Sequence, residues 1–411
     1  MCDDWGIVRG IVFLLVFLPA IAEGQTMQGI PRSPVGPTST TDRVPEDFYI
    51  MPWIAAGVVY DDNVFFAPQG LHQEDVFLRV TPGLQASYQS TPFTIVGNYR
   101  FDSEVYSKLD QLNSAAQRQF GTIELRSRPS SSLTLAGTLG YAQTNTPFEL
   151  NLLTASQTAR FRTERYFINP SAEYRLDPLS KLSGSYGYSK DIFAGQQEIN
   201  TNLFNLGYDR RIGTHDTLGP AYLGRYFTFG GTQISGFGGN PDPVTSHALM
   251  LAWGHEFSAD TRLDVRVGPR ITNGDLDKRP EAFVGLRRRF QNGDISFGYT
   301  SAITTIIGTV GATRTDSLLL IATYEPIKHL TFTVSPTVAW LASTAFDSTV
   351  YTGYLEAAYQ FNKYVTAKGS AFFSYQEGNF LPTGGITASD VIVSRNVYWL
   401  RLEFTYPTRW D

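Results

Sequence analysis

The chain has 411 residues, of which 14% are aromatic and only 17% are charged. It contains 37 glycines, 22 tyrosines and 28 phenylalanines, a mix that favours β-strands over helices and is unusual for soluble domains. The formal net charge of −5 and the scattered Lys and Arg residues exclude the basic footprint of a nucleic-acid-binding protein.

The N-terminus has the pattern of a signal peptide. Arg9 precedes an apolar run from Ile11 to Leu18, and Ala20 and Ala22 occupy the −3 and −1 positions of a cleavage site after Ala22. The run is shorter than the ~20 residues that cross a bilayer as a helix, which favours residues 1–22 as a cleaved signal over a membrane anchor. Cys2 is the only cysteine and would leave with this segment, so we expect a mature chain without disulfides.

Residues 23–46 are rich in proline and hydroxyl side chains and have no periodicity, which predicts a flexible periplasmic leader. The pattern changes in residues 47–411, which we interpret as one domain. No later segment approaches 18 consecutive apolar residues, so helical membrane spans are excluded.

From Phe48 to Tyr406 the chain alternates apolar and polar residues with a period of two. In residues 76–88, for example, Leu78 and Tyr88 share one face and Arg79 shares the other with Gln85. Charged residues stay on one face, and the apolar faces begin and end in aromatic residues, as expected for the girdles of a membrane barrel. The same split recurs in 93–102, 166–176, 263–271 and 330–340.

Short turns and longer connections alternate along this domain, as they do in outer-membrane barrels. With both termini on the periplasmic side, the short turns predict a transmembrane antiparallel up-and-down β-barrel of 18 strands, with 16 as the alternative. The apolar connection 304–311 leaves strand boundaries open there. The short turns are predicted at 89–92, 128–130, 177–179, 213–216, 258–260, 291–294, 326–328 and 361–363.

The C-terminal segment from Tyr398 to Tyr406 alternates Tyr, Leu and Phe with polar residues and forms an amphipathic last strand. It resembles the terminal signal that the barrel assembly machinery reads, which implies this machinery as a partner. The tail Pro407–Asp411 departs from that pattern, because such signals usually stop at an aromatic residue.

Three short motifs carry a family resemblance. At Val59–Phe65 (VYDDNVF), Glu74–Val76 (EDV) and Thr81–Leu84 (TPGL) the chain resembles a family of outer-membrane β-barrel porins (type 2), several of which accompany exopolysaccharide loci. The resemblance implies a location in the lipid of the outer membrane of a Gram-negative-type bacterium. It also implies a pore or export role, with polysaccharide export components as partners, and it transfers no catalytic residue.

The motif Asp61-Asp62-Asn63 has two interpretations. These residue types form turns through their side chains, and this is the interpretation that we favour. The alternative is a contact with a divalent cation or a glycan.

Charged residues fall on the inward face of the predicted strands, where water or an opposite charge makes them tolerable. They either line a pore or pair into networks that brace the wall. The predicted pore-lining residues are Arg79, Arg100, Asp102, Glu124, Arg126, Glu173, Arg175, Asp264, Arg266, Arg270, Arg287, Arg289, Arg401 and Glu403. Among them Arg266, Arg270, Arg287 and Arg289 lie on adjacent strands, and we hypothesise that they bias the pore towards anionic solutes.

Other chemistries have weaker support. The five histidines are predicted in loops, in turns and on a lipid-facing stripe, which argues against a barrel hydrolase. The Gly-rich stretch 230–239 lacks the lysine and the helix of a phosphate loop, and we expect an outer loop that can fold inward as a constriction. No residue spacing specifies a metal, and we expect no cofactor.

These patterns favour a passive pore or an export conduit for exopolysaccharide or related anionic solutes. The alternative is a structural or adhesive barrel whose loops bind partners, and an enzyme is the third possibility. Only the first of the three requires an open lumen.

Overall fold

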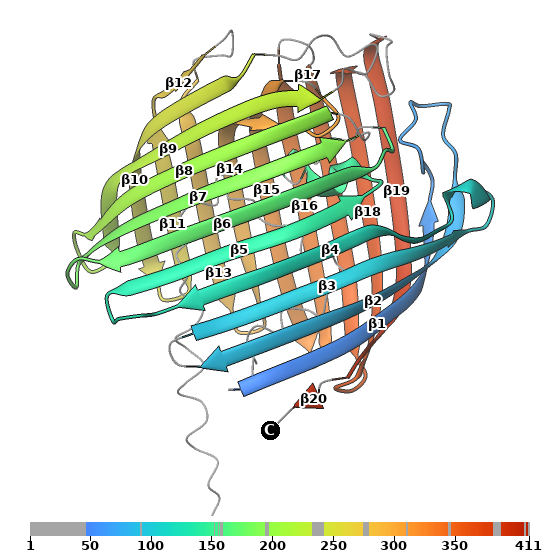
Figure 1. Cartoon of the computed structure of the whole chain (residues 1–411), viewed down its shortest axis with the longest axis horizontal. Helices are drawn as coiled ribbons and strands as arrows, with labels where there is room; N and C mark the ends of the chain where they lie inside the picture. Colours follow the sequence, from blue (N-terminus) through green and yellow to red (C-terminus); the bar gives the residue numbers. More distant parts are fainter. Residues whose placement is uncertain are drawn as a thin grey trace, which may run out of the picture.

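The computed structural model describes residues 47–90, 93–151, 153–154, 156, 159–193, 197–231, 242–273, 279–309, 311–343, 347–380, 388–406 and 408–409. The predicted signal peptide and leader lie outside these residues. The described strands form one antiparallel sheet that closes on itself into a barrel (Figure 1).

Eighteen strands form the wall, which confirms the predicted strand count. The segments β11 and β12 count as one wall strand, since both pair with β10. Pro269 divides this strand in two because it has no N–H to donate. A further short segment, β20, follows the last wall strand. The bounds are β1 Asp47–Asp61, β2 Asp75–Ser90, β3 Phe93–Tyr106, β4 Ser114–Ser127, β5 Leu133–Thr144, β6 Thr163–Arg175, β7 Ser180–Phe193, β8 Gln197–Arg211, β9 Asp216–Gly231, β10 Val244–Ser258, β11 Thr261–Gly268, β12 Arg270–Thr272, β13 Glu281–Phe290, β14 Gly293–Thr305, β15 Ala312–Ile327, β16 Leu330–Ala342, β17 Asp347–Gln360, β18 Val365–Phe380, β19 Ala388–Thr405 and β20 Thr408–Arg409.

The barrel closes where β1 pairs with β19. Nine residue pairs connect the two strands, from Trp53 opposite Thr405 to Asp61 opposite Val397. Gly57 permits the close approach, because a Cβ there would lie 2.4 Å from the carbonyl oxygen of Leu400. After the last strand, β20 pairs with Tyr49 and Ile50 and covers more of the edge of β1. Among the described residues, this closure pairs the first wall strand with the last, so neither strand is an open edge along the length that pairs.

Each of the eight predicted short turns connects two described strands, and these predictions are confirmed, although Thr91 and Pro92 themselves lie outside the described residues. We call the end of the barrel with these turns the short-turn end; β1 starts there and β19 finishes there (Figure 1). The opposite, long-loop end carries the longer connections, including the short 3-10 helices η3 (Asp110–Leu112) and η4 (Pro147–Leu150). Of the described helices, none has the length and apolar character that a membrane span requires.

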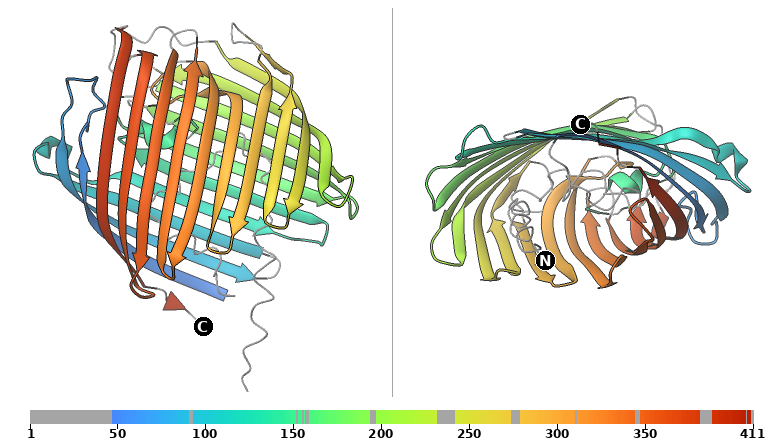
Figure 2. Two further views of the ribbon diagram at one scale, coloured as in Figure 1. Left: turned by 180° about the vertical axis from the view of Figure 1, so that it is seen from behind. Right: turned by 90° about the horizontal axis from the view of Figure 1, so that it is seen from below.

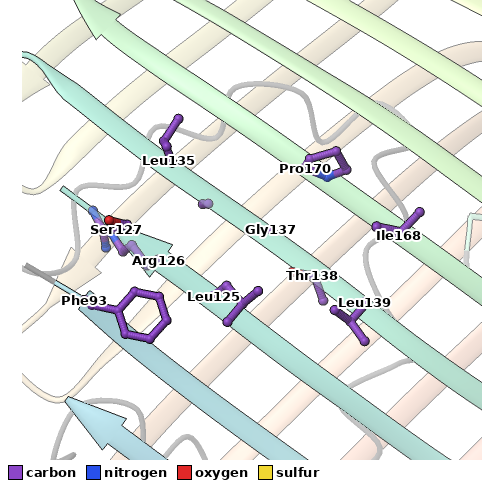
Figure 3. A pocket seen from close by; sticks show the side chains of 11 residues that line it. Phe93, Leu125, Arg126, Ser127, Leu135, Gly137, Thr138, Leu139, Ile168 and Pro170 are labelled. Carbon is purple, nitrogen blue, oxygen red and sulfur yellow. The ribbon is translucent and has the colours of Figure 1, made fainter. Parts of the chain in front are cut away.

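The outer face of the wall is apolar. Val76, Leu78, Leu84 and Tyr88 are exposed on β2, and the predicted alternation places Arg79 on the opposite face. The outer faces of β3 to β6 form a shallow apolar groove, shown in Figure 3. An apolar outer surface on a closed wall of hydrogen-bonded strands meets the requirement for spanning lipid, so the chain is a transmembrane barrel. Single-chain bacterial barrels of this kind lie in the outer membrane, the location predicted from the sequence. The apolar residues that line the groove are Phe93, Leu125, Leu135, Leu139, Ile168 and Pro170.

Candidate functional site: the barrel lumen

Three connections at the long-loop end place buried side chains inside the barrel. They are residues 62–74 between β1 and β2, the described part of 145–162 between β5 and β6, and the described part of 306–311 between β14 and β15. Seen from below, η4 lies inside the ring of strands (Figure 2, right). We call these three connections the luminal plug.

The β14–β15 connection supplies the apolar centre of the plug. Ile306 and Ile307 are fully buried, and Ile306 packs on inward residues of β16 and β17. This burial explains why residues 304–311 are apolar although they form a loop, since the loop is surrounded by protein instead of water. Ile307 belongs to a buried cluster with Phe120, Ala142, Leu150, Phe193 and Ile199.

The β5–β6 connection meets the β14–β15 connection inside the barrel. The side-chain oxygen of Asn151 accepts a hydrogen bond from the Ile307 amide at 2.9 Å, and Asn151 Nδ2 donates to the Ile307 carbonyl at 3.3 Å. Around the 18-strand ring these two connections are eight strands apart in one direction and ten in the other. Their contact therefore reaches across the lumen.

The helix η4 anchors the plug to a second part of the wall through Phe148. The Phe148 ring lies between Phe66 of the β1–β2 connection and Phe372 of β18, with centroid distances of 5.6 and 5.3 Å. Arg395 of β19 stacks on Phe66 and on Phe148, with its guanidinium carbon 4.3 and 5.1 Å from the ring centroids. Two of the three plug connections thus meet at one arginine.

Glu149 anchors the plug to a third part of the wall. Arg118 of β4 donates from Nη2 to Glu149 Oε1, and the Thr144 hydroxyl of β5 donates to Glu149 Oε2 at 2.9 Å. Arg118 Nη1 also lies 3.1 Å from Asp102 and from Glu104 on β3. Burial raises the pKa of the Glu149 carboxyl, but the charge and hydrogen bond of Arg118 outweigh this effect and hold the pKa below its usual value.

The motif Asp61-Asp62-Asn63 fastens the first strand to the last. Asp61 forms a buried ion pair with Arg395, with Nη2 to Oδ2 at 2.6 Å, and Asp62 accepts hydrogen bonds from the amide and side chain of Asn396. Asn63 bonds to the carbonyl of Ala67 through Nδ2 at 2.9 Å and accepts the Ala67 amide at 2.8 Å. Asn63 makes the predicted turn contacts, whereas Asp61 and Asp62 bind the last strand. Within the part of the chain that the structure describes, no group of three or more His, Cys, Asp or Glu is arranged to hold a metal ion.

Several predicted pore-lining residues near the plug join ion pairs. Arg79 Nη2 lies 2.7 Å from Glu104 Oε1, and Arg401 Nη2 lies 3.2 Å from Glu356 Oε2. Both guanidinium groups stack on the Trp399 ring, that of Arg79 at 4.7 Å and that of Arg401 at 4.4 Å from its centroid. Two other predicted residues belong to the same inner surface: Asp102 accepts a hydrogen bond from Thr81, and Glu403 pairs with Lys368. Arg100 stacks on the Phe120 ring at 4.5 Å. In this part of the wall, the inward charges therefore fit the interpretation that they pair into networks which brace the wall.

The four arginines that we expected to form one ladder have different surroundings. Arg270 and Arg225 share Glu281, with N–O distances of 3.1 and 2.6 Å. Arg266 of β11 stacks on the Phe283 ring of β13 at 5.5 Å. Asp264, the next inward residue of β11, binds Arg262 instead. Alternation places a residue on the correct face but does not reveal its partner.

Towards the short-turn end, the charged residues of the inner face are more exposed. Glu124, Arg175 and Arg287 are exposed there although they occupy inward positions, while Arg126, Glu173 and Arg289 are partly exposed. Exposed charges on the inner face require water. The plug therefore occupies the long-loop half of the barrel, and a hydrated vestibule occupies the half near the short turns.

Sequence reasoning missed several luminal residues. Arg118, Lys368 and Arg395 occupy inward positions on β4, β18 and β19, and the period-two pattern extends to all three. Glu149 and Asn151 gave no such signal, because a loop has no periodicity. The Gly-rich stretch expected as a constriction lies outside the described residues from 232 to 239.

The two histidines of β10 lie on the outer face, as predicted. His247 Nδ1 is 2.8 Å from the Tyr222 hydroxyl, and His255 Nδ1 is 2.8 Å from Asp216 Oδ1. Neither joins the luminal residues described above.

No protein-family model and no curated protein matches this chain. Among solved structures, it is similar to OpdQ of Pseudomonas aeruginosa, with 12% identity, a TM-score of 0.43, and coverage of 88% of this chain and 97% of the other. It is also similar to the FrpB iron transporter of Neisseria meningitidis, with 9% identity, a TM-score of 0.46, and coverage of 89% and 82%. The siderophore receptor PirA of Pseudomonas aeruginosa has 8% identity and a TM-score of 0.44, with coverage of 89% and 81%. At these values the similarities do not identify a function for this chain.

Proposed function

We propose that this protein is a pore or export conduit of the outer membrane, used by exopolysaccharide or related anionic solutes, with a constriction at its long-loop end. One observation carries the proposal. The wall is apolar outside, and inside it presents exposed charges such as Glu124, Arg175 and Arg287 to a vestibule. Such charges would be costly without water, so the interior supports the passage of hydrophilic solutes.

The nature of the solute rests on two further features. Arg175 and Arg287 are exposed in the vestibule, and exposed arginines attract anions. The resemblance of the YDDN and TPGL segments to type 2 porins supports a role beside polysaccharide export components. A polymer would pass only after the plug has moved, since the Asn151–Ile307 contact crosses the lumen.

Conductance of the purified full chain in planar bilayers tests the pore. We expect discrete current steps, and a folded barrel that stays silent even after removal of plug contacts would support the structural or adhesive alternative instead.

The ion selectivity of the pore can be tested with a matched pair of variants. We expect Arg287→Ala to lower the chloride-to-potassium permeability ratio and Glu124→Ala to raise it, because each removes one exposed vestibule charge.

The Asn151–Ile307 contact predicts how the constriction responds to mutation. Asn151→Leu leaves the buried N–H and C=O of Ile307 without their partner, which costs the closed plug about 1–3 kcal/mol. Since 1.4 kcal/mol is a factor of ten in an equilibrium constant, the ratio of open to closed channels should rise on the order of tenfold to a hundredfold. Single-channel recording measures this ratio.

The control for this variant is Asn169→Leu. Asn169 lies on the inner face of β6 and pairs with Thr138, away from the plug contacts described above. The same chemical change there should leave the ratio unaltered. Equal effects of the two variants would show that the Asn151 contact does not hold the constriction closed.

A further inference from the structure

The carboxylate of Glu149 lies in a site built by the wall of the barrel. Its two oxygens have different donors, the Arg118 guanidinium for Oε1 and the Thr144 hydroxyl for Oε2. Both donors belong to wall strands, β4 and β5, whereas Glu149 belongs to the plug. Arg118 is buried, whereas 18% of the Glu149 side chain is exposed, so Glu149 is the more accessible partner of this ion pair.

Around this site the wall carries one more arginine than carboxylates. At three other places on the inner wall one cation faces one carboxylate: Arg401 with Glu356, Lys368 with Glu403, and Arg395 with Asp61. On the opposite wall, Arg225 and Arg270 share the carboxylate of Glu281. Around the Glu149 site, three arginines face two wall carboxylates. The arginines are Arg79, Arg100 and Arg118, and the carboxylates are Asp102 and Glu104.

Glu149 supplies the third carboxylate, and it is the only acidic residue among residues 145–162. The same connection also carries Arg160, whose Nη2 lies 3.0 Å from the Tyr106 hydroxyl and 3.8 Å from Glu104. Since Arg160 and Glu149 belong to the same connection, a plug that withdraws with both would remove one positive and one negative charge from the wall. The wall alone then retains its surplus positive charge beside Arg118.

We propose that Arg118 and Thr144 form a binding site for a carboxylate group of the transported solute, and that Glu149 occupies this site as a tethered substitute while the plug is closed. The proposal rests on the proposed pore and names the group that the constriction recognises. A solute carboxylate that takes the place of Glu149 forms the same two hydrogen bonds and releases η4 from β4 and β5. Solute binding and opening are then one event.

The chemistry of the site favours a singly charged carboxylate. Two donors match two oxygens, and charge-assisted bonds to arginine are the stronger kind. Asp102 and Glu104 both lie 3.1 Å from Arg118 Nη1 and would repel the second charge of a phosphate dianion. A uronic acid or a small organic acid carries the group that fits.

Binding of acetate to the full chain in detergent micelles tests the site without any need for conduction. Glu149→Ala removes the tethered competitor, whose effective concentration is on the order of millimolar for a short connection. By titration calorimetry we expect this variant to bind acetate on the order of tenfold more tightly than the unmodified chain. Acetamide, which has the same shape without the charge, should not bind to either protein.

Two further variants identify the donors. Adding Thr144→Val to Glu149→Ala should weaken acetate binding, while adding Thr138→Val, on the inner face of the same strand, should not. If Glu149→Ala does not give a heat-modifiable folded barrel, Glu149→Gln keeps the shape of the side chain and removes only its charge. Acetate should then raise the open probability of the unmodified chain and not that of Glu149→Gln, which is already less firmly closed.

The outcomes separate this proposal from the proposed function. Equal acetate affinity of Glu149→Ala and the unmodified chain, or binding insensitive to Thr144→Val, overturns the carboxylate site even if the barrel conducts. Acetate binding that follows the expected order in a barrel that never conducts supports the site and overturns the pore.

Discussion

Arg395→Ala is expected to lower the free energy of unfolding of the barrel by about 3–5 kcal/mol, the range for removal of one partner of a buried ion pair. The change leaves Asp61 as an uncompensated carboxylate that is only 1% exposed, at the junction of the first and last strands. It also removes the cation that stacks on Phe66 and Phe148. This one guanidinium therefore contributes both to the closure of the wall and to the anchoring of the plug.

Urea titration of the barrel folded in lipid vesicles measures the effect, and a double variant provides its control. Asp61→Leu combined with Arg395→Met removes both charges, and replacement of a buried pair by apolar residues is often close to neutral. The double variant should therefore recover most of the stability that Arg395→Ala loses. A double variant as unstable as the single one would mean that the ion pair is not what matters at the junction.

The wall of the barrel was predictable from the sequence because lipid imposes a periodic requirement. Each strand must present an apolar residue at every second position, so Leu78 and Leu84 mark the outer face of β2 without any knowledge of its neighbours. Turn residues such as Asp177 and Asn362 end the strands through local hydrogen bonds, Asp177 to the amide of Leu179 and Asn362 to that of Tyr364. Both signals are local, and together they gave 18 strands.

The plug was not predictable in the same way, because its contacts join distant parts of the chain. Asn151 and Ile307 are 156 residues apart, and Asp61 and Arg395 are 334 apart. No local pattern encodes either pair. One signal did exist: Ile306 and Ile307 lie in a connection between strands, where an apolar run indicates burial against protein. The same limit explains Arg270, whose inward position was predicted while its pairing with Glu281 was not.

The two faces of β5 should tolerate an arginine very differently, as the neighbouring residues Thr138 and Leu139 can show. Leu139 is exposed on the outer face near the middle of β5, opposite Ile168 and Ile123 on the adjoining strands. Arginine on the lipid face of a membrane barrel costs about 2–4 kcal/mol at the bilayer midplane. Leu139→Arg should destabilise the folded barrel by this amount, as measured by urea titration in vesicles.

Thr138→Arg is the matched control, because it introduces the same side chain one residue away on the other face. Thr138 lies opposite Glu124 of β4, an inward carboxylate that is exposed in the vestibule. An arginine there meets water and an opposite charge, so its cost should be small. The difference between the two variants depends only on which side of the wall is hydrocarbon. Equal stability of the two would mean that both faces of β5 are hydrated, and a wall of that kind does not span a membrane.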